Sequence, residues 1–209
     1  GVVTYTPPAD YNGSATISYT VSDGRGGSDT GTVAVTVNSI NDAPVSTVTS
    51  ASTNEDTAVT IDVLGGASDV DGDTLSISGL SVNKGTVTTN SSGALVYTPD
   101  ADFNGTAIIT LTIEDGNGGT VAVTITVTVA DINDPPVVTG ETATIDEDDI
   151  LMVNVLTNDI DADSDPLSIT SLSSSNGTVT SNVSGVVTYT PPADYNGSAT
   201  ISYTVSDGR

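Results

Sequence analysis

The ten residues TVAVTITVTV, Thr120–Val129, alternate between apolar and mostly threonine side chains. Successive side chains of a β-strand point to opposite faces, so Val121, Val123, Ile125, Val127 and Val129 share one face of a strand. Most of these residues are β-branched, which favours a strand over a helix. The stretch therefore predicts a long strand with one buried face and one threonine-rich solvent face.

Shorter runs of the same kind precede it, separated by Gly, Asn and Asp. Together with an edge strand near Val45–Ser50 they make about seven strands per roughly 92 residues, with no segment of helical periodicity. We expect an all-β fold of tandem seven-stranded antiparallel Greek-key sandwiches. Pairs such as Asn104-Gly105, Asp115-Gly116 and Asn117-Gly118 predict turns with positive φ. The runs are AVTIDV, LSISGL, GTVTT, ALVYT and AIITLTI.

The chain is internally repeated. Residues 1–25 recur unchanged as residues 185–209, an offset of 184, and match residues 93–117 at 13 of 25 positions. At half that offset, 92, Asn41–Val45 falls on Asn133–Val137 without a gap. We read the chain as a window on an end-to-end array: the C-terminal part of one repeat (1–42), a complete repeat (43–134), and a repeat without its last strand (135–209).

Composition limits the function. The chain has 27 acidic and three basic residues, a formal charge of −24, which argues against nucleic acid or an anionic membrane as a partner. No apolar run has the length of a membrane span. Histidine and cysteine are absent, which removes the commonest general base, thiol nucleophiles and the ligands that zinc prefers. We predict that the chain is not an enzyme.

Many of the acids recur at strand ends. Grouped carboxylates repel one another unless a cation compensates them, and calcium accepts six to eight oxygen ligands in irregular geometry. The segment from Asp69 to Leu80 opens like an EF-hand loop, but Thr74 and Leu80 occupy the glycine and glutamate positions, so that motif fails. The recurring acids are Glu55/Glu147, Asp69/Asp161, Asp71/Asp163, Asp10/Asp102/Asp194, Asp23/Asp115/Asp207 and Asp42/Asp134.

In this order the acids resemble the calcium motifs of cadherin domains, and especially those of bacterial cadherin-like and VCBS-type tandem repeats of large surface adhesins. The resemblance covers the whole chain. The motifs that carry it are, in order, a glutamate, an Asp-x-Asp, an acid-x-acid segment, an Asp beside glycine and an Asn-Asp linker followed by proline. In the complete repeat the residues at these positions are Glu55, Asp69 and Asp71, Asp100 and Asp102, Asp115, and Asn133-Asp134.

The resemblance implies a Ca²⁺ site at each joint between repeats. The sequence departs from animal cadherins where Ala43 or Pro135 replaces a second linker Asn, and where Pro8 and Pro192 replace Asp100. For the first joint the implied ligands are Asp10, Asp42, Asp69, Asp71 and Asp115, with the carbonyls of Ile40 and Asn41. For the second they are Glu55, Asp100, Asp102, Asp131, Asp134, Asp161, Asp163 and Asp207, with the carbonyls of Ile132 and Asn133. Glu147 and Asp194 fill the same slots in the last repeat.

By the same resemblance we expect an exported stalk segment on a bacterial surface, stiffened by Ca²⁺ for adhesion or biofilm formation. Its partners would be neighbouring repeats and, end to end, other copies of the chain, whose residues 26–42 fit an exposed strand edge. The alternative is a carbohydrate-binding module that uses the rings of Tyr5, Tyr11, Tyr19 and their copies, with polysaccharide as the partner. A glycosidase is the least favoured class, because nothing in the sequence indicates a cleft.

Overall fold

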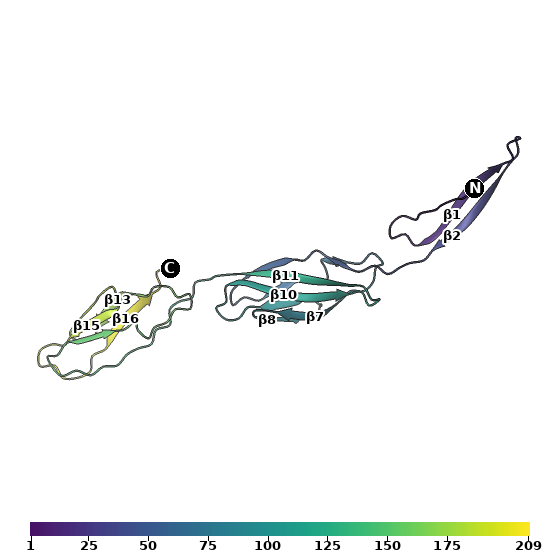
Figure 1. Cartoon of the computed structure of the whole chain (residues 1–209). Helices are drawn as coiled ribbons and strands as arrows, with labels where there is room; N and C mark the ends of the chain where they lie inside the picture. The colour runs from purple at the N-terminus through teal and green to yellow at the C-terminus, as the bar shows by residue number, and fades with distance from the viewer. The chain divides into compact units, whose positions relative to one another are not determined.

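The computed structural model describes all 209 residues and contains strands but no helix. The strands fall into two compact units: unit 1 comprises residues 1–100 and 105–129, and unit 2 comprises residues 101–104 and 130–209. No helix in the structure has the length and apolar character that a membrane span requires. The expectation of an all-β fold is confirmed (Figure 1).

Unit 1 contains a complete β-sandwich. A four-stranded sheet of order β4-β11-β10-β7 faces a three-stranded sheet of order β5-β9-β8, which together make the seven strands expected. A short pair, β3 and β6, lies beside them. The strands are β3 (Val45–Ser46), β4 (Ser50–Asn54), β5 (Val59–Ile61), β6 (Ala67–Ser68), β7 (Ser76–Val82), β8 (Thr86–Thr89), β9 (Leu95–Thr98), β10 (Gly105–Glu114) and β11 (Thr120–Ala130).

The sequence did not distinguish β3 from β4. One edge strand was expected near Val45–Ser50, but β3 pairs with β6, and the chain then moves across to pair with β11, where Thr126 N donates to Thr49 O. The segment SASTN of β4 has no apolar side chain larger than alanine. Its strand is defined by backbone hydrogen bonds to a neighbour, which periodicity does not report.

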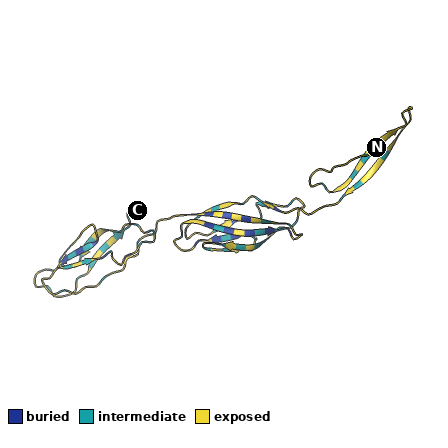
Figure 2. Cartoon of the chain, viewed as in Figure 1, coloured by how far each residue is buried: buried dark blue, intermediate teal, exposed yellow.

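The core of the sandwich follows the predicted alternation. In β10 and β11, which pair antiparallel over ten residues, buried side chains alternate with half-buried or exposed ones along most of each strand (Figure 2). Val123, Ile125, Val127 and Val129 are buried as expected, and Val121 is half-buried. They pack among the other buried side chains of unit 1, which are Ile61, Val63, Ala94, Leu95, Tyr97, Ala107, Ile109, Leu111 and Ile113.

Unit 1 also contains a hairpin of β1 (Gly13–Ser22) and β2 (Ser28–Val37), paired over ten residues. Unit 2 repeats much of the sandwich, with one sheet of order β12-β15-β14 and one of order β13-β16. Its strands are β12 (Leu151–Asn154), β13 (Ser168–Ser174), β14 (Thr178–Ser181), β15 (Val186–Thr190) and β16 (Ile201–Ser206). Val155, Val187 and Tyr189 are its buried apolar side chains.

The predicted turns are present. Gly105, Gly116 and Gly118 have φ of 124°, 80° and 107°, a region that glycine enters without a steric cost. Gly116 and Gly118 lie between β10 and β11, where they allow the tight turn that begins at Asp115. This turn brings one of the candidate ligands to the end of the sandwich.

Substitution in β11 tests the one-sided core. We expect Ile125→Ala, which empties a site with 0% exposure, to lower the free energy of unfolding by about 2–5 kcal/mol. The control Thr124→Ala lies on the exposed face of the same strand and should cost about 1 kcal/mol or less. Chemical denaturation followed by circular dichroism measures both; equal losses for the two variants would contradict the assignment of faces.

Candidate metal centres at the linkers

Two clusters of acidic side chains, one in each unit, surround the Asn-Asp linkers. We call them the first and second linker clusters. Their members correspond one to one at the 92-residue offset. The first consists of Asn41, Asp42, Asp69, Asp71, Asp73 and Asp115; the second consists of Asn133, Asp134, Asp161, Asp163, Asp165 and Asp207.

Each cluster centres on an Asp-x-Asp-x-Asp loop. Carboxylate oxygens of Asp69, Asp71 and Asp73 lie within 4.8 Å of one another, and the three equivalent acids of the second cluster do the same. The loop is tightened by the first Asp of each triplet, because Asp73 N donates to Asp69 Oδ1 at 3.5 Å and Asp165 N to Asp161 Oδ1 at 3.1 Å. The turn therefore directs three carboxylates to one side.

The linker backbone is hydrogen-bonded to the middle carboxylate of the triplet. Asp42 N donates to Asp71 Oδ2 at 2.8 Å, and Asp134 N donates to Asp163 Oδ2 at the same distance. A hydrogen bond to an ionised carboxylate is stronger than one between neutral groups. Asp71 and Asp163 thus fix the start of the chain segment that follows each linker.

The linker asparagine provides a second attachment. Asn41 Nδ2 donates to Asp115 Oδ2 at 2.8 Å, and Asn133 Nδ2 donates to Asp207 Oδ2 at 2.8 Å. The asparagine hydrogen bond is the main reason that the pKa values of Asp115 and Asp207 lie below the ordinary 3.8, and backbone N–H groups lower both further. Asp23, the equivalent residue in the hairpin, also has a lowered pKa, but through the backbone N–H groups of Arg25 and Gly27.

Asp73 and Asp165 are cluster members that the sequence interpretation missed. Asp73 Oδ2 accepts from Asn117 Nδ2 at 2.8 Å, and Asp165 Oδ2 pairs with Arg209 Nε at 2.8 Å. Asn117 and Arg209 occupy the same position of the repeat. The signal for these acids was present, because DVDGD and DADSD place a third aspartate at the same spacing in both copies.

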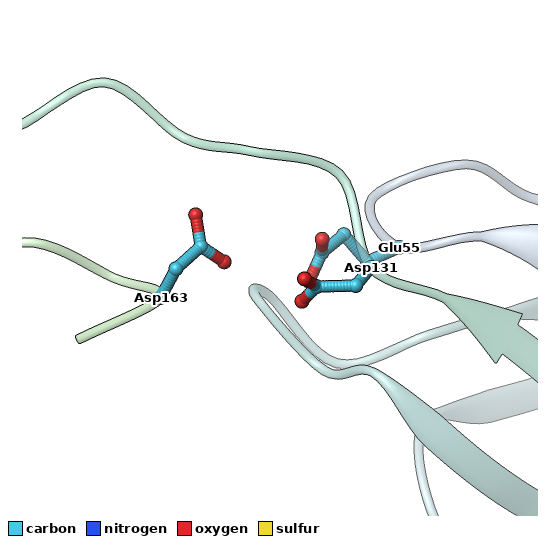
Figure 3. Close-up of side chains that lie close together, drawn as sticks. All are labelled: Glu55, Asp131 and Asp163. Carbon is cyan, nitrogen blue, oxygen red and sulfur yellow. The ribbon is translucent and has the colours of Figure 1, made fainter. Parts of the chain in front are cut away.

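The other predicted ligands of unit 2 lie close to its cluster. Carboxylate oxygens of Asp131 and Asp163 come within 4.8 Å of one another, as do those of Asp102 and Asp134 (Figure 3 draws Asp131 and Asp163). Asp131 also accepts from Asn104 Nδ2 at 2.6 Å. The structure thus brings these predicted ligands together within one unit.

In unit 1, the predicted ligand Asp10 shares a cavity with two members of the first linker cluster. Asp10 lines a cavity of about 340 Å³ together with Asp42 and Asp71. Asp10, Asp102 and Asp194 all adopt the left-handed backbone, with φ of 56°, 53° and 56°, so the same turn presents each of them. Glu55, labelled in Figure 3, is 4% exposed in the turn that follows β4.

Several predicted ligands are not gathered into these clusters. Asp100 accepts a hydrogen bond from Gly85 N at 2.9 Å and so attaches to the turn between β7 and β8. Glu147 is exposed, and the Asp194 N–H donates to Asp148 Oδ1 at 3.1 Å. Ile40 and Ile132, which are 83% and 48% exposed, are predicted to act through their backbone carbonyls rather than their side chains. Their roles as ligands stay predictions.

The residue chemistry fits calcium. The side chains in the two clusters offer a metal ion only oxygen ligands, and the clusters carry negative charge. The buried oxygens Asp69 Oδ2 and Asp161 Oδ2 have no hydrogen-bond partner. Carboxylates from several loops suit a cation that tolerates irregular geometry, as Ca²⁺ does. Zinc fits poorly because the chain has neither histidine nor cysteine.

The chain matches one family of known proteins over most of its length. The family model described as "Cadherin-like domain" matches residues 1–38, 40–130 and 132–209. A search of curated proteins gave no match.

Solved structures show the same fold at low sequence identity. The structure of the protocadherin gammaB7 EC3-6 cis-dimer is 19% identical, with a TM-score of 0.56 over 93% of this chain and 57% of that chain. The protocadherin gammaB4 extracellular domain is also 19% identical, with a TM-score of 0.55 over 93% of this chain and 39% of that chain. This chain therefore spans only about half or less of the length of these structures.

Removing the linker asparagine should change the titration of its aspartate. We expect Asn41→Ala to raise the pKa of Asp115, and Asn133→Ala that of Asp207, because each loses its largest stabilising hydrogen bond. A lowered pKa stabilises the folded state above the ordinary value of 3.8 and loses that effect as pH falls through the folded-state pKa. Both variants should therefore be less stable than the parent chain above pH 3.8, and this difference should shrink as pH falls through the folded-state pKa of the parent.

Carboxyl ¹³C chemical shifts, followed by NMR through an acid titration, measure these pKa values. Asp23 is the internal control, because its hydrogen bonds come from its own turn and should be unaffected. An unchanged pKa of Asp115 in Asn41→Ala would show that the asparagine does not support that carboxylate in solution.

Proposed function

This chain belongs to the cadherin-like domain family, and we propose that it is a calcium-binding stalk segment of an extracellular bacterial adhesin. Domains of this family are extracellular repeats that typically bind calcium and act in adhesion, and the fold is typically not that of an enzyme. In the proposed function Ca²⁺ binds at the linker clusters and sets the geometry between neighbouring repeats.

The observation that carries the proposal is that one set of carboxylate contacts is built twice. The hydrogen bonds Asp42 N to Asp71 and Asp134 N to Asp163 both measure 2.8 Å, and the linker asparagine contacts in the two clusters measure the same. Scattered surface acids would not recur with the same partners. A repeated set of contacts supports a repeated role.

The charge of the clusters supports a cation as the ligand. Two unit charges 4.8 Å apart repel by about 3 kcal/mol at an effective dielectric constant of about 20, and by less where water and salt screen them. Each triplet contains three such pairs. A divalent cation that replaces repulsion with coordination would stabilise the folded loops.

The ligands in this proposal come from both sides of a linker. Asp69 and Asp71 in the first cluster, and Asp161 and Asp163 in the second, would coordinate the ion, and Ca²⁺ when bound would neutralise them. Asp42 and Asp134 would connect the ion to the linker. The further proposed ligands, from the preceding repeat or the linker itself, are Asp10, Ile40 and Asn41 at the first joint and Glu55, Asp102, Asp131, Ile132 and Asn133 at the second.

The proposed role is mechanical. A short linker allows neighbouring repeats to rotate when its acids repel, whereas an ion that contacts both sides restricts that rotation and stiffens the array. Extracellular modules bind Ca²⁺ at about 0.1–1 mM, so such sites fill outside the cell and not in the cytosol. Bacterial origin, a VCBS-type array, and a stalk or filament used in biofilms are parts of the proposal.

The tyrosines of the repeated YTP segment support a structural role for the repeats. Tyr97 and Tyr189 are 0% and 6% exposed, so their rings fill the cores of the two units. Tyr5, the equivalent residue in the N-terminal segment, is 36% exposed. We therefore favour the stalk over the carbohydrate-binding alternative.

Calcium should stabilise the chain through the linker clusters. At 100 times the dissociation constant one ion adds about 2.7 kcal/mol to the free energy of unfolding, so chelation should lower the melting temperature. Asp71→Asn or Asp163→Asn should remove much of the gain at its own cluster. Calorimetry with Ca²⁺ and with EGTA measures this effect, and small-angle scattering of the same samples reports the stiffening.

The control for this experiment is Asp149→Asn, which removes the same charge from an exposed position outside both clusters. It should leave the calcium-dependent shift intact. If Ca²⁺ changes neither the melting temperature nor the scattering of the unmodified chain, the calcium-dependent stalk is wrong. If Asp149→Asn and Asp163→Asn reduce the shift equally, the effect is general charge screening.

A further inference from the structure

We propose that Glu141 and Asp159 form an additional cation site inside unit 2, which takes a hard divalent cation, Ca²⁺ or Mg²⁺, beside the hydroxyl of Tyr203. We call these three residues the Tyr203 cluster. None of them belongs to the linker clusters, so an experiment that disproves this site would leave the proposed calcium sites at the linkers untouched, and the reverse.

Glu141 contributes one oriented and one open carboxylate oxygen. Tyr203 Oη, on β16, donates to Glu141 Oε2 at 2.9 Å, which fixes the carboxylate against the strand. The other oxygen, Glu141 Oε1, is buried and has no hydrogen-bond partner. A buried polar atom without a partner costs about 1–3 kcal/mol, and more when the group is charged.

Asp159 supplies a second open oxygen. Its side chain is 9% exposed; Oδ1 accepts from Thr139 N at 2.8 Å, and Oδ2 is buried without a hydrogen-bond partner. Burial of the Tyr203 hydroxyl, the Glu141 hydrogen bond and the charges of Glu141 and Asp159 together raise the pKa of Tyr203 to about 12. Because Thr139 lies two residues before Glu141, its hydrogen bond to Asp159 holds that carboxylate close to the segment that carries Glu141.

The complete repeat in unit 1 lacks all three groups. At the 92-residue offset Glu141, Asp159 and Tyr203 correspond to Thr49, Ala67 and Leu111. The backbone match is secure here, because the Val137–Ile160 bridge corresponds to the Val45–Ser68 pair of β3 and β6. Leu111 is 3% exposed in the core of its sandwich. The fold therefore does not require the Tyr203 cluster. Its three polar residues occur together in one repeat.

A hard cation would provide a partner for the two carboxylate oxygens that have no hydrogen bond. Two carboxylate oxygens, Glu141 Oε1 and Asp159 Oδ2, are oxygen ligands of the kind that Ca²⁺ and Mg²⁺ prefer. Glu141 and Tyr203, but not Asp159, line a cavity of about 1060 Å³, which gives room for coordinating waters on the Glu141 side of the site. Mg²⁺ keeps more of its waters and a stricter octahedron than Ca²⁺, so the two ions should differ in affinity.

Tyr203 provides a local probe for the test. The full 209-residue chain is labelled with ring-¹³C tyrosine, and the Tyr203 signal, one of seven, is assigned with Tyr203→Phe. CaCl₂ and MgCl₂ are titrated separately, with NaCl at matched ionic strength as the blank. We expect a saturable shift of the Tyr203 signal with one or both divalent ions, and the lower midpoint identifies the preferred ion.

Variants connect the shift to the site. The double variant Glu141→Thr with Asp159→Ala installs the residues of the other repeat and should weaken binding at least tenfold, whereas Asp163→Asn should change it less than twofold. Glu141→Gln, which preserves shape, gives an independent test if the double variant does not fold. The proposal is overturned by no shift up to about 10 mM, tenfold above the weakest usual extracellular sites, by the same shift in NaCl, or by an unchanged shift in the double variant.

Discussion

Carboxylates that the sequence distributes over more than 70 residues lie side by side at each linker, and the amide groups of the linker hold them there. In the second linker cluster, Asn133 and the backbone N–H of Asp134 attach to Asp207 and Asp163. These charge-assisted hydrogen bonds offset part of the repulsion among the acids. The position of the linker relative to the sandwich that follows it depends on them.

The β-sandwich makes this convergence possible. The Asp-x-Asp-x-Asp loop follows the β6 position, and Asp115 follows β10, so both come to the same end of the sandwich. The strands between them are long and buried on one face, which gives the loops a rigid base. A loop residue that binds a carboxylate can therefore differ between repeats while the core is kept, as Asn117 and Arg209 show at one equivalent position.

The repeats are alike in backbone but not in all their side chains. Linker contacts are repeated almost without change, whereas one equivalent position is held by the buried Leu111 in unit 1 and by the half-buried Tyr203 in unit 2. A hydroxyl in that position needs a partner, and Glu141 provides it. A single repeat can therefore acquire a polar site while the array keeps its common frame.

The sequence by itself determined the strand pattern, the 92-residue period and most of the acids at the linkers, because alternation, turn glycines and exact repetition are local properties of the chain. Only the tertiary structure decided that Asp73 and Asp165 join the clusters, that Asp100 binds Gly85 in the turn between β7 and β8, and that β3 and β4 are separate strands. It also placed Glu141 at the hydroxyl of Tyr203 and Asp159 at the backbone of Thr139. Such pairings depend on how loops distant in sequence fold onto one another, and neither periodicity nor spacing records that.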